Sequence, residues 1–518
     1  GKTKLIHTLM ARILWADDEI ESLKPHLLFL KNKGFEVVAV NSGVEAVEKV
    51  NESKFDLIFL DENMPGISGL TTLEEIKKIK SSIPIVMITK SEEEMIMEEA
   101  IGKQISDYLI KPVNPNQILM AIKKLLDGKR LISETNSTSY RQEFNKISQD
   151  LNLVDSLVGW KEIFQKLTYW ELQLEVSDQN MVEVFNMQKE EANQLYSRFI
   201  DRNYEEIIQS DELLSHNLLK TELFPELKNQ SYFLIVIDNL RYDQWLIIKP
   251  IVEDLFSIDS EGIYSSIIPT TTQYARNALF AGLSPLEISK RYAHKWVSEE
   301  ENEGKNLHED FFFNENLRRN QLNLKTSYHK ITNLNAGKKL VQQIDNLKNN
   351  DINTIVYNFV DTLSHARTDM EVIKELAEDE SAYRSITLSW FKHSPLYDIL
   401  KKISNTSSKV FLTTDHGTVR VKNPTKVIGP KNTNSNMRYK VSKNLTYQSK
   451  DVIEALYPEK INLPKSNISS SFIFAKEDKF FVYPNNYNHF AKLYNDTFQH
   501  GGISMEEMLI PYVKLIGK

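Results

Sequence analysis

The chain contains no cysteine. Disulfide bonds and thiolate metal sites are therefore excluded, and any bound metal must be held by nitrogen and oxygen atoms. No apolar run approaches the roughly 20 residues that a membrane-spanning helix needs, and no apolar signal segment lies near the N-terminus. We therefore expect a cytoplasmic protein without a membrane span. Met10 has the context of a native start, which would make residues 1–9 a foreign remnant.

Basic residues are the minority among the charges. The chain has 63 Lys and Arg against 71 Asp and Glu, and its formal net charge is −8. Such a balance disfavours broad neutralisation of nucleic-acid phosphates, so we expect no binding to duplex DNA. At roughly 150 residues per domain, a chain of 518 residues suggests about three domains.

Glycine and proline are nearly absent from the middle of the chain. Only Gly159 and Pro225 occur between Lys129 and Gln230, so few residues there interrupt a helix. Apolar residues recur at helical spacing, as in Ile163, Leu167, Trp170 and Leu174. We predict a helical bundle linker over residues 128–228 that transmits dimerisation or shields an active site. No basic recognition helix is apparent in it, which argues against a DNA-binding output.

Four short apolar runs within residues 10–127 end in polar side chains. They cover residues 12–16, 55–60, 83–88 and 108–110, and helical patterns at 43–50 and 70–80 alternate with them. This alternation predicts a parallel sheet, whose strand ends lie at one edge. The side chains gathered there would be Asp17, Asp18, Asp61, Thr89 and Lys111.

Crowded carboxylates repel one another unless a hard cation neutralises them, so the expected ion at this edge is Mg²⁺. A metal-bound aspartate can also accept a phosphoryl group as a nucleophile. A solvated acidic loop would explain any one of these features, but not all of them in this order. We therefore expect the first domain, residues 1–127, to carry a phosphoacceptor site.

Leu60-Asp61-Glu62-Asn63-Met64-Pro65-Gly66 and Lys111-Pro112 resemble the motifs of response-regulator receiver domains. The resemblance implies a CheY-like, doubly wound (βα)5 fold that a sensor histidine kinase phosphorylates on Asp61. Mg²⁺ would be held by Asp18 and Asp61 with the Asn63 carbonyl, beside Asp17. Thr89 and Tyr108 would form the switch pair, and Lys111 would supply a counter-charge.

Three later apolar runs, residues 233–237, 355–360 and 410–414, each end in an aspartate. Histidines follow two of these aspartates, and another histidine lies beside glycines near the C-terminus. Ligands of open parallel α/β sheets bind beyond the carboxyl ends of the strands. Three carboxylates and three imidazoles at such positions form the ligand set of a two-metal hydrolytic site. They are Asp238, Asp361, His365, Asp415, His416 and His500.

A threonine run, residues 270–272, lies between the first two of these aspartates. Such a run alone is typical of a β-favouring or capping segment. A hydroxyl bound to a divalent metal at the start of a helix can instead act as a nucleophile. Its position among the ligands favours the second interpretation.

The order of these residues resembles the alkaline phosphatase superfamily, specifically its PglZ-type branch. The resemblance implies an α/β sandwich over residues 229–518 and favours Thr272 over Thr271 as nucleophile. One Zn²⁺ would be bound by Asp361, His365 and His500, and the other by Asp238, Asp415, His416 and Thr272. Arg276 is the first candidate donor to phosphoryl oxygens, and Arg241 and Arg367 are alternatives, each more typical of a surface salt bridge.

The three segments together resemble response regulators associated with type IX secretion in Bacteroidetes. The function expected is a zinc-dependent phosphodiesterase or phosphatase, acting on nucleotide or oligonucleotide diesters and forming a phosphorylation-dependent homodimer. Segments 285–350 and 418–498 would form walls around the site, with Tyr292, Trp296 and residues 311–313 available to stack on bases. The alternative is a signalling scaffold with a structural zinc site, acting through a sensor kinase, a sigma factor or secretion-motor proteins.

Overall fold

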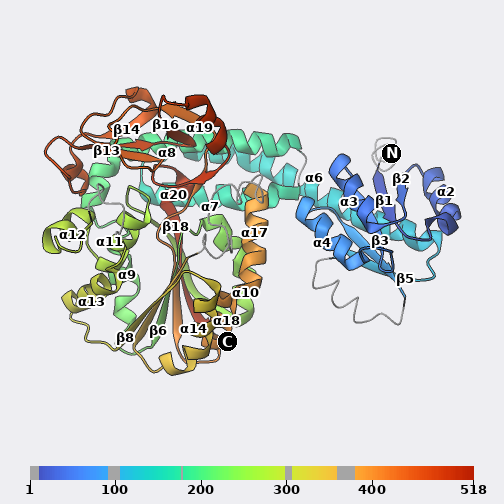
Figure 1. Cartoon of the computed structure of the whole chain (residues 1–518), viewed down its shortest axis with the longest axis horizontal. Helices are drawn as coiled ribbons and strands as arrows, with labels where there is room; N and C mark the ends of the chain where they lie inside the picture. Colours follow the sequence, from blue (N-terminus) through green and yellow to red (C-terminus); the bar gives the residue numbers. More distant parts are fainter. Residues whose placement is uncertain (1–10, 91–104, 177–178, 298–305, 359–379) are drawn as a thin grey trace. The chain divides into compact units, whose positions relative to one another are not determined.

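The computed structural model describes residues 11–90, 105–176, 179–297, 306–358 and 380–518 (Figure 1). Contacts divide the chain into two compact units. The first holds residues 1–143 and 173–182, and the second holds residues 144–172 and 183–518. No helix among the described residues is long and apolar enough to cross a membrane. The finer division at 127 and 228 stays a prediction.

The first unit contains a five-stranded parallel sheet in the order β2-β1-β3-β4-β5. The strands are β1 (Arg12–Ala16), β2 (Glu36–Val40), β3 (Leu57–Asp61), β4 (Ile85–Thr89) and β5 (Asp107–Ile110). All but β2 correspond to predicted apolar runs. That strand was missed although residues 37–40 are apolar, because no carboxylate or other candidate ligand follows its end.

Helices cover both faces of this sheet, because alternate strand residues point to opposite sides. Leu14 and Ala16 pack with α3 (Gly43–Glu52) and α4 (Gly69–Ile79). Trp15 on the other face packs with α2 (Lys24–Asn32) and the start of α6 (Pro115–Leu153). Serine side chains cap the N-termini of α3 and α4 and so determine where these helices begin. The doubly wound receiver fold is confirmed.

The middle of the chain is helical, as its lack of helix breakers predicts. It comprises α6, α7 (Leu157–Gln173), α8 (Gln179–Gln209) and the short α9 (Leu218–Glu222). Trp160, Ile163 and Leu167 are buried, so the aromatic and aliphatic stripe belongs to a core. Within the second unit, α8 packs on the C-terminal domain through Asn193, whose side-chain amide donates to both carboxylate oxygens of Glu506 at 3.0 and 3.1 Å.

The second unit is built on a six-stranded mixed sheet in the order β7-β18-β10-β6-β9-β8. Four strands are parallel: β10 (Lys409–Thr413), β6 (Tyr232–Ile237), β9 (Ile352–Tyr357) and β8 (Thr326–Ile331). Beyond β10, β18 (Leu509–Gly517) and β7 (Phe256–Ser265) run antiparallel to their neighbours. The segment 285–350, expected as a wall around the site, also contributes β8 and α14 (Leu334–Leu347) to the main layers.

Two cores hold helices against the opposite faces of this sheet (Figure 1). Phe233, Ile235 and Ile237 of β6 pack with α10 (Tyr242–Leu255), α14, α17 (Glu380–His393) and α18 (Pro395–Ser404). Leu234 and Val236 pack with α9, α11 (Asn277–Ala281), α12 (Pro285–Arg291) and α13 (Glu309–Arg319). This is the α/β sandwich that the resemblance implied.

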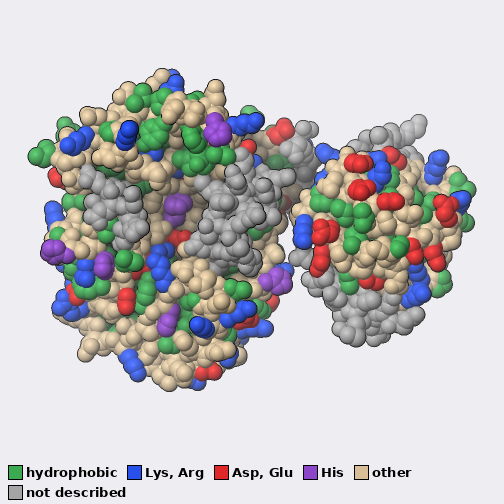
Figure 2. Space-filling view, viewed as in Figure 1, with side chains coloured by type: hydrophobic (Ala, Val, Ile, Leu, Met, Phe, Trp, Pro, Cys, Tyr) green, Lys and Arg blue, Asp and Glu red, His purple; other side chains and the backbone are tan. Residues whose placement is uncertain are grey.

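Three small sheets form a lobe between β10 and β18. They pair β11 (Val419–Arg420) with β17 (Phe498–Gln499), β12 (Asn423–Lys426) with β16 (Lys479–Val482), and β13 (Tyr439–Ser442) and β14 (Val452–Ala455) with β15 (Ser471–Ala475). The lobe also carries α19 (Tyr487–Tyr494), and α20 (Met505–Met508) leads back to β18. Histidine, acidic and basic side chains lie close together between this lobe and the main sheet (Figure 2).

Candidate metal centre and phosphoacceptor site

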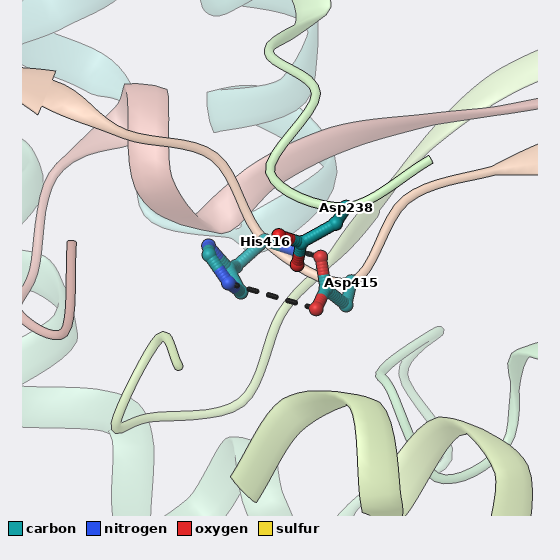
Figure 3. A group of neighbouring side chains, drawn as sticks. All are labelled: Asp238, Asp415 and His416. Carbon is teal, nitrogen blue, oxygen red and sulfur yellow. Dashed lines mark hydrogen bonds and ion pairs between the residues drawn. The ribbon is translucent and has the colours of Figure 1, made fainter. Parts of the chain in front are cut away.

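Two adjacent parallel strands place the first group of ligands. Asp238 follows β6 directly, and Asp415 and His416 follow β10, so their side chains meet beyond the carboxyl ends of the strands (Figure 3). One potential ligand atom from each residue lies within 4.8 Å of those of the other two. Asp415 and His416 are fully buried, and the Asp238 side chain is 14% exposed. The arrangement fits a metal centre and has no evident role in apolar packing.

Backbone groups hold the loops that carry these ligands. Asn239, with φ of 60°, donates its backbone N–H to Asp415 Oδ1 at 3.1 Å. The backbone N–H of Gly417 donates to Glu507 O at 2.9 Å. A Cβ at position 417 would lie 1.9 Å from the carbonyl oxygen of Glu506, so only glycine fits there. The loop after β10 is thus held against α20.

Thr272 lies at the start of a π-helix, Thr272–Arg276. Its hydroxyl is 3.4 Å from Asp238 Oδ1 and 3.5 Å from His416 Nε2. The neighbouring Thr271 has a buried hydroxyl without a hydrogen-bond partner among the described residues. Of the two threonines weighed as nucleophile, the structure brings Thr272 into contact with the ligand cluster.

His500 joins the cluster from β17, its ring stacked on His416 with centroids 4.2 Å apart. The Nδ1 atoms of His416 and His500 lie 2.9 Å from the backbone oxygens of Gly417 and Thr270. A carbonyl oxygen only accepts hydrogen bonds, so each Nδ1 carries the proton and each Nε2 keeps its lone pair. Both imidazoles are therefore in the tautomer that can bind a metal through Nε2.

Burial dominates the electrostatics of the cluster. It raises the pKa of Asp238, with the charge of Asp415 as the next cause. Burial also raises the pKa of Asp415, against the opposing effect of Arg276. It lowers the pKa of His416, and it lowers that of His500 to about 4, helped by His416. The imidazoles are thus neutral near pH 7, as metal ligation requires.

A bound cation fits these residues. Asp415 Oδ2 is buried and accepts no hydrogen bond from the described part of the chain. Two carboxylates beside neutral imidazoles form a donor set of nitrogen and oxygen that suits Zn²⁺. Asp361, His365 and Arg367, named by the sequence analysis, lie outside the described residues.

Arg276 lies in the cluster but is already bound by acids. Its Nε contacts Glu309 at 2.6 Å, and its Nη1 lies 3.3 Å from Asp238 and 3.9 Å from Asp415. The alternative donor Arg241 is buried and paired with Asp243 and with Glu380, so the expectation of a surface salt bridge is wrong.

Three residues near the ligand cluster were not predicted from the sequence: Asn306, Glu309 and Lys330. Glu309 holds Arg276, and the Asn306 side chain donates to the Thr272 carbonyl oxygen at 3.0 Å. Single polar residues in a polar stretch give no motif that could have marked them. The residues considered for base stacking have aromatic neighbours within the chain: Tyr292 contacts Phe311 and Phe312, and Trp296 contacts Tyr274.

The first unit carries the second acidic cluster. Ligand atoms of Asp17, Asp18 and Asp61 lie within 4.8 Å of one another. Lys111 Nζ lies 2.9 Å from Asp61 and 3.5 Å from Asp17, while the buried Asp61 Oδ2 accepts no hydrogen bond from the described residues. Burial raises the pKa of Asp61 to about 6, although the Lys111 hydrogen bond opposes it.

The remaining receiver residues lie around this cluster. Thr89 is buried at the end of β4, Asn63 is exposed just beyond β3, and Tyr108 on β5 is 39% exposed. Burial alone would lower the Lys111 pKa, but hydrogen bonding to Asp61 and the charge of Asp17 raise it. The lysine therefore stays charged beside Asp61.

Models of three protein families match the chain. The response regulator receiver domain matches residues 13–123, the PorX response regulator linker domain matches 130–208, and the BREX system PglZ alkaline phosphatase-like domain matches 218–515. The fold and the two clusters define a two-component response regulator with an alkaline phosphatase-like domain. The chain belongs to the PglZ family, and its three domains are those of a PorX-type response regulator.

Similar proteins share the receiver. The chemotaxis protein CheY of Bacillus subtilis is 36% identical over 117 residues, which cover 22% of this chain and 98% of CheY. The CpxR homolog of Haemophilus influenzae is 31% identical over 167 residues, 32% of this chain and 71% of that protein. The alignment with ZraR of Klebsiella oxytoca covers 27% of ZraR. The solved structure of Vibrio cholerae CheY4 shares 28% identity over 22% of this chain and 98% of that chain, with a TM-score of 0.22.

Proposed function

We propose that the C-terminal domain is a zinc-dependent phosphodiesterase whose nucleophile is Thr272, controlled by phosphorylation of Asp61. The observation that carries the proposal is the Thr272 hydroxyl beside two buried ligand residues, 3.4 Å from Asp238 and 3.5 Å from His416. Membership of an alkaline phosphatase-like family supports the same class of reaction.

Zinc would be held by Asp238, Asp415, His416 and Thr272, with His500 contributing to a second ion together with Asp361 and His365. When bound, the two ions would supply positive charge to the oxygens that attack and leave phosphorus. The neutral, Nε2-directed imidazoles described above are the chain's own contribution to ligation. The Mg²⁺ ion of the receiver would be held by Asp17, Asp18, Asp61 and Asn63.

The reaction has two displacements. Thr272 Oγ1 forms a bond to phosphorus while the bond to one ester oxygen breaks, and that oxygen leaves as an alcohol carrying the threonine proton. Water then forms a bond to phosphorus, the bond to Oγ1 breaks, and the proton from water returns to Thr272. Asp238, 3.4 Å from the hydroxyl, can orient its proton in both steps.

The charge balance favours a diester. A phosphate diester carries one negative charge and a monoester approaches two, so a monoester needs more positive charge around its oxygens. Arg276 is engaged by Glu309 and Asp238 and is not free for a bidentate contact with a dianion. Nucleotide or oligonucleotide diesters are the substrates we propose.

The receiver places this activity under a sensor kinase. A phosphoryl group on Asp61 would favour a homodimer through the face around Tyr108, and the output would act in type IX secretion from the cytoplasm. A sigma factor or secretion-motor proteins would be further partners.

The test is turnover of bis-p-nitrophenyl phosphate and p-nitrophenyl phosphate by the full chain, with its zinc content measured. We expect diester hydrolysis that chelation removes and zinc restores, and that Thr272→Ala reduces at least a hundredfold, as for other nucleophiles. Thr271→Ala is the matched control and should keep most of the activity. A wild-type chain that holds zinc but turns over neither ester, nor a panel of dinucleotides, would favour the scaffold function instead.

A further inference from the structure

Lys330 lies beside the cluster without belonging to the ligand set. It comes from β8, the edge strand next to β9, and its side chain is 32% exposed. Its Nζ donates to the backbone oxygen of Asn306 at 3.3 Å and lies 4.0 Å from Glu309 Oε1. Since Asn306 donates to the Thr272 carbonyl at 3.0 Å, one residue links this ammonium to the nucleophile's backbone.

The two cationic side chains near Thr272, Arg276 and Lys330, differ in the partners that their N–H groups already have. Arg276 is 4% exposed and directs its guanidinium at Glu309, Asp238 and Asp415. The Lys330 ammonium has three N–H donors, and its one hydrogen bond within the described residues goes to a neutral carbonyl. A charged ligand could therefore use the remaining donors of Lys330, whereas Arg276 already directs Nε and Nη1 at carboxylates.

The surroundings place this ammonium in the field of the site. Burial lowers the Lys330 pKa, Glu309 opposes that shift, and Arg276 adds to it; Asp238 and Asp415 act on Lys330 as well. The Lys330 side chain reaches solvent and its ion-pair partner Glu309 is 4.0 Å away, so its ammonium is open to an approaching anion. Filling the metal centre with cations would draw on the charges of Asp238 and Asp415 and leave Lys330 still less compensated.

We propose that Lys330 binds an anionic phosphoryl oxygen of the ester, as a substrate-binding residue of this site. The inference rests on the proposed function for the identity of the ester, and it adds the group that recognises the phosphate charge. A single flexible ammonium provides one charge for the single charge of a diester.

The experiment measures inorganic phosphate binding to the zinc-loaded full chain by calorimetry, and KM and kcat for bis-p-nitrophenyl phosphate. Lys330→Met should weaken phosphate binding and raise KM by about tenfold, the loss expected for one hydrogen bond to a charged group. Lys330→Arg should recover part of both losses. Lys338→Met, at an exposed position of α14, is the matched control and should change neither.

A structural role would lower kcat or melting temperature and leave the phosphate affinity intact, and that outcome overturns the proposal. Thr272→Ala separates the proposal from the hydrolase assignment, since it should keep the Lys330-dependent phosphate affinity while losing turnover. Lys330-dependent phosphate binding in a chain that hydrolyses no ester would uphold the anion site and refute the hydrolase. Ester hydrolysis with affinity and KM unchanged in Lys330→Met would do the reverse.

Discussion

At the scale of single residues, the two acidic clusters depend on burial of groups that water would normally solvate. The Asp61 carboxylate shows this most clearly, because one of its oxygens pairs with Lys111 and the other accepts no hydrogen bond from the described residues. Desolvation favours its protonated form. A bound cation reverses that preference, so ionisation and ion binding at this carboxylate are linked.

This linkage predicts that the affinity for Mg²⁺ depends on pH. The pKa of Asp61 is raised from 3.8 to about 6, so without the ion its protonated form stabilises the fold at low pH, and that contribution is lost as the pH rises from about 4 through 6. Mg²⁺ needs the ionised form. We expect the calorimetric affinity of the full chain for Mg²⁺ to rise steeply between pH 5 and 7.

Asp61→Asn is the control for this titration, because the amide cannot ionise. It should weaken Mg²⁺ binding at pH 7 and flatten the pH profile below that value. An affinity that changes equally with pH in both proteins would assign the titration to another group, such as Asp17, whose pKa burial also raises.

The sequence is most informative about residues whose chemistry is tied to the end of an apolar strand. Asp238, Asp415 and His416 could be identified in this way, and the structure brings them together. Glu309 and Lys330 could not, because their importance arises from what they contact and no local pattern encodes it. The family resemblance favoured Thr272 over the adjacent Thr271, and the structure places only the Thr272 hydroxyl against Asp238 and His416 among the described contacts.

At the scale of elements, the short helix α20 holds the loop that carries Asp415 and His416. Arg438 from the lobe makes two contacts to Glu507 on this helix, Nε to Oε1 at 2.9 Å and Nη2 to Oε2 at 2.7 Å. Both side chains are fully buried. The Glu507 carboxylate also accepts from the backbone N–H of Gly502, and its backbone oxygen accepts from that of Gly417, so one residue joins the loops of His416 and His500.

Substitution of Arg438 should therefore lower the free energy of unfolding. Arg438→Met leaves the Glu507 carboxylate buried without its cation, and we expect a loss of about 3–5 kcal/mol in the free energy of unfolding. Denaturant unfolding of the full chain, followed by a signal of the second unit, measures it. Zinc content should fall in the same variant.

Arg420→Met is the comparison, because its partner Asp496 lies 3.3 Å away at a partly exposed position. Its loss should be about 1 kcal/mol or less. Equal losses for the two variants would show that burial of the Arg438–Glu507 pair does not set its contribution.

Helices and strands could be predicted where the pattern of apolar residues agrees with the residues that end or interrupt an element. The strands β1, β3, β4, β6, β9 and β10 match apolar runs with polar ends, and the helical middle follows from its lack of Gly and Pro. The antiparallel β7 and β18 were not predicted, because their partners are distant in sequence and neither strand ends in a ligand. The small sheets of the lobe consist of strands of two to five residues, too short for a periodic pattern.

At the scale of the whole molecule, the helical segment and the C-terminal domain are not independent. Besides the Asn193–Glu506 contact, the backbone N–H of Ile268, near the threonine run, donates to the Tyr204 hydroxyl oxygen at 3.0 Å. Lys189 on α8 lies 2.8 Å from Glu171 and 3.6 Å from Glu506. A boundary at 228 separates sequence patterns, whereas these contacts unite residues on both sides of it.

Two truncated chains test whether the stability of the C-terminal domain depends on the helical segment. Residues 229–518 alone would expose the surface that α8 covers and leave Glu506 without Asn193 and Lys189, so we expect a lower melting temperature and a tendency to aggregate. Residues 144–518 retain these contacts and should melt close to the second unit of the full chain. Differential scanning calorimetry of the three proteins makes the comparison. Equal stability of the two fragments would contradict the prediction.

The contacts of α8 with α20 also bear on how such chains can be recombined. A crossover near residue 143 would exchange one receiver for another while the buried polar contacts of α8 stay with their partners. A crossover at 228 would have to supply a foreign helix with an amide and an ammonium in the same places. Natural and engineered chimaeras should therefore accumulate at the first junction and be rare at the second.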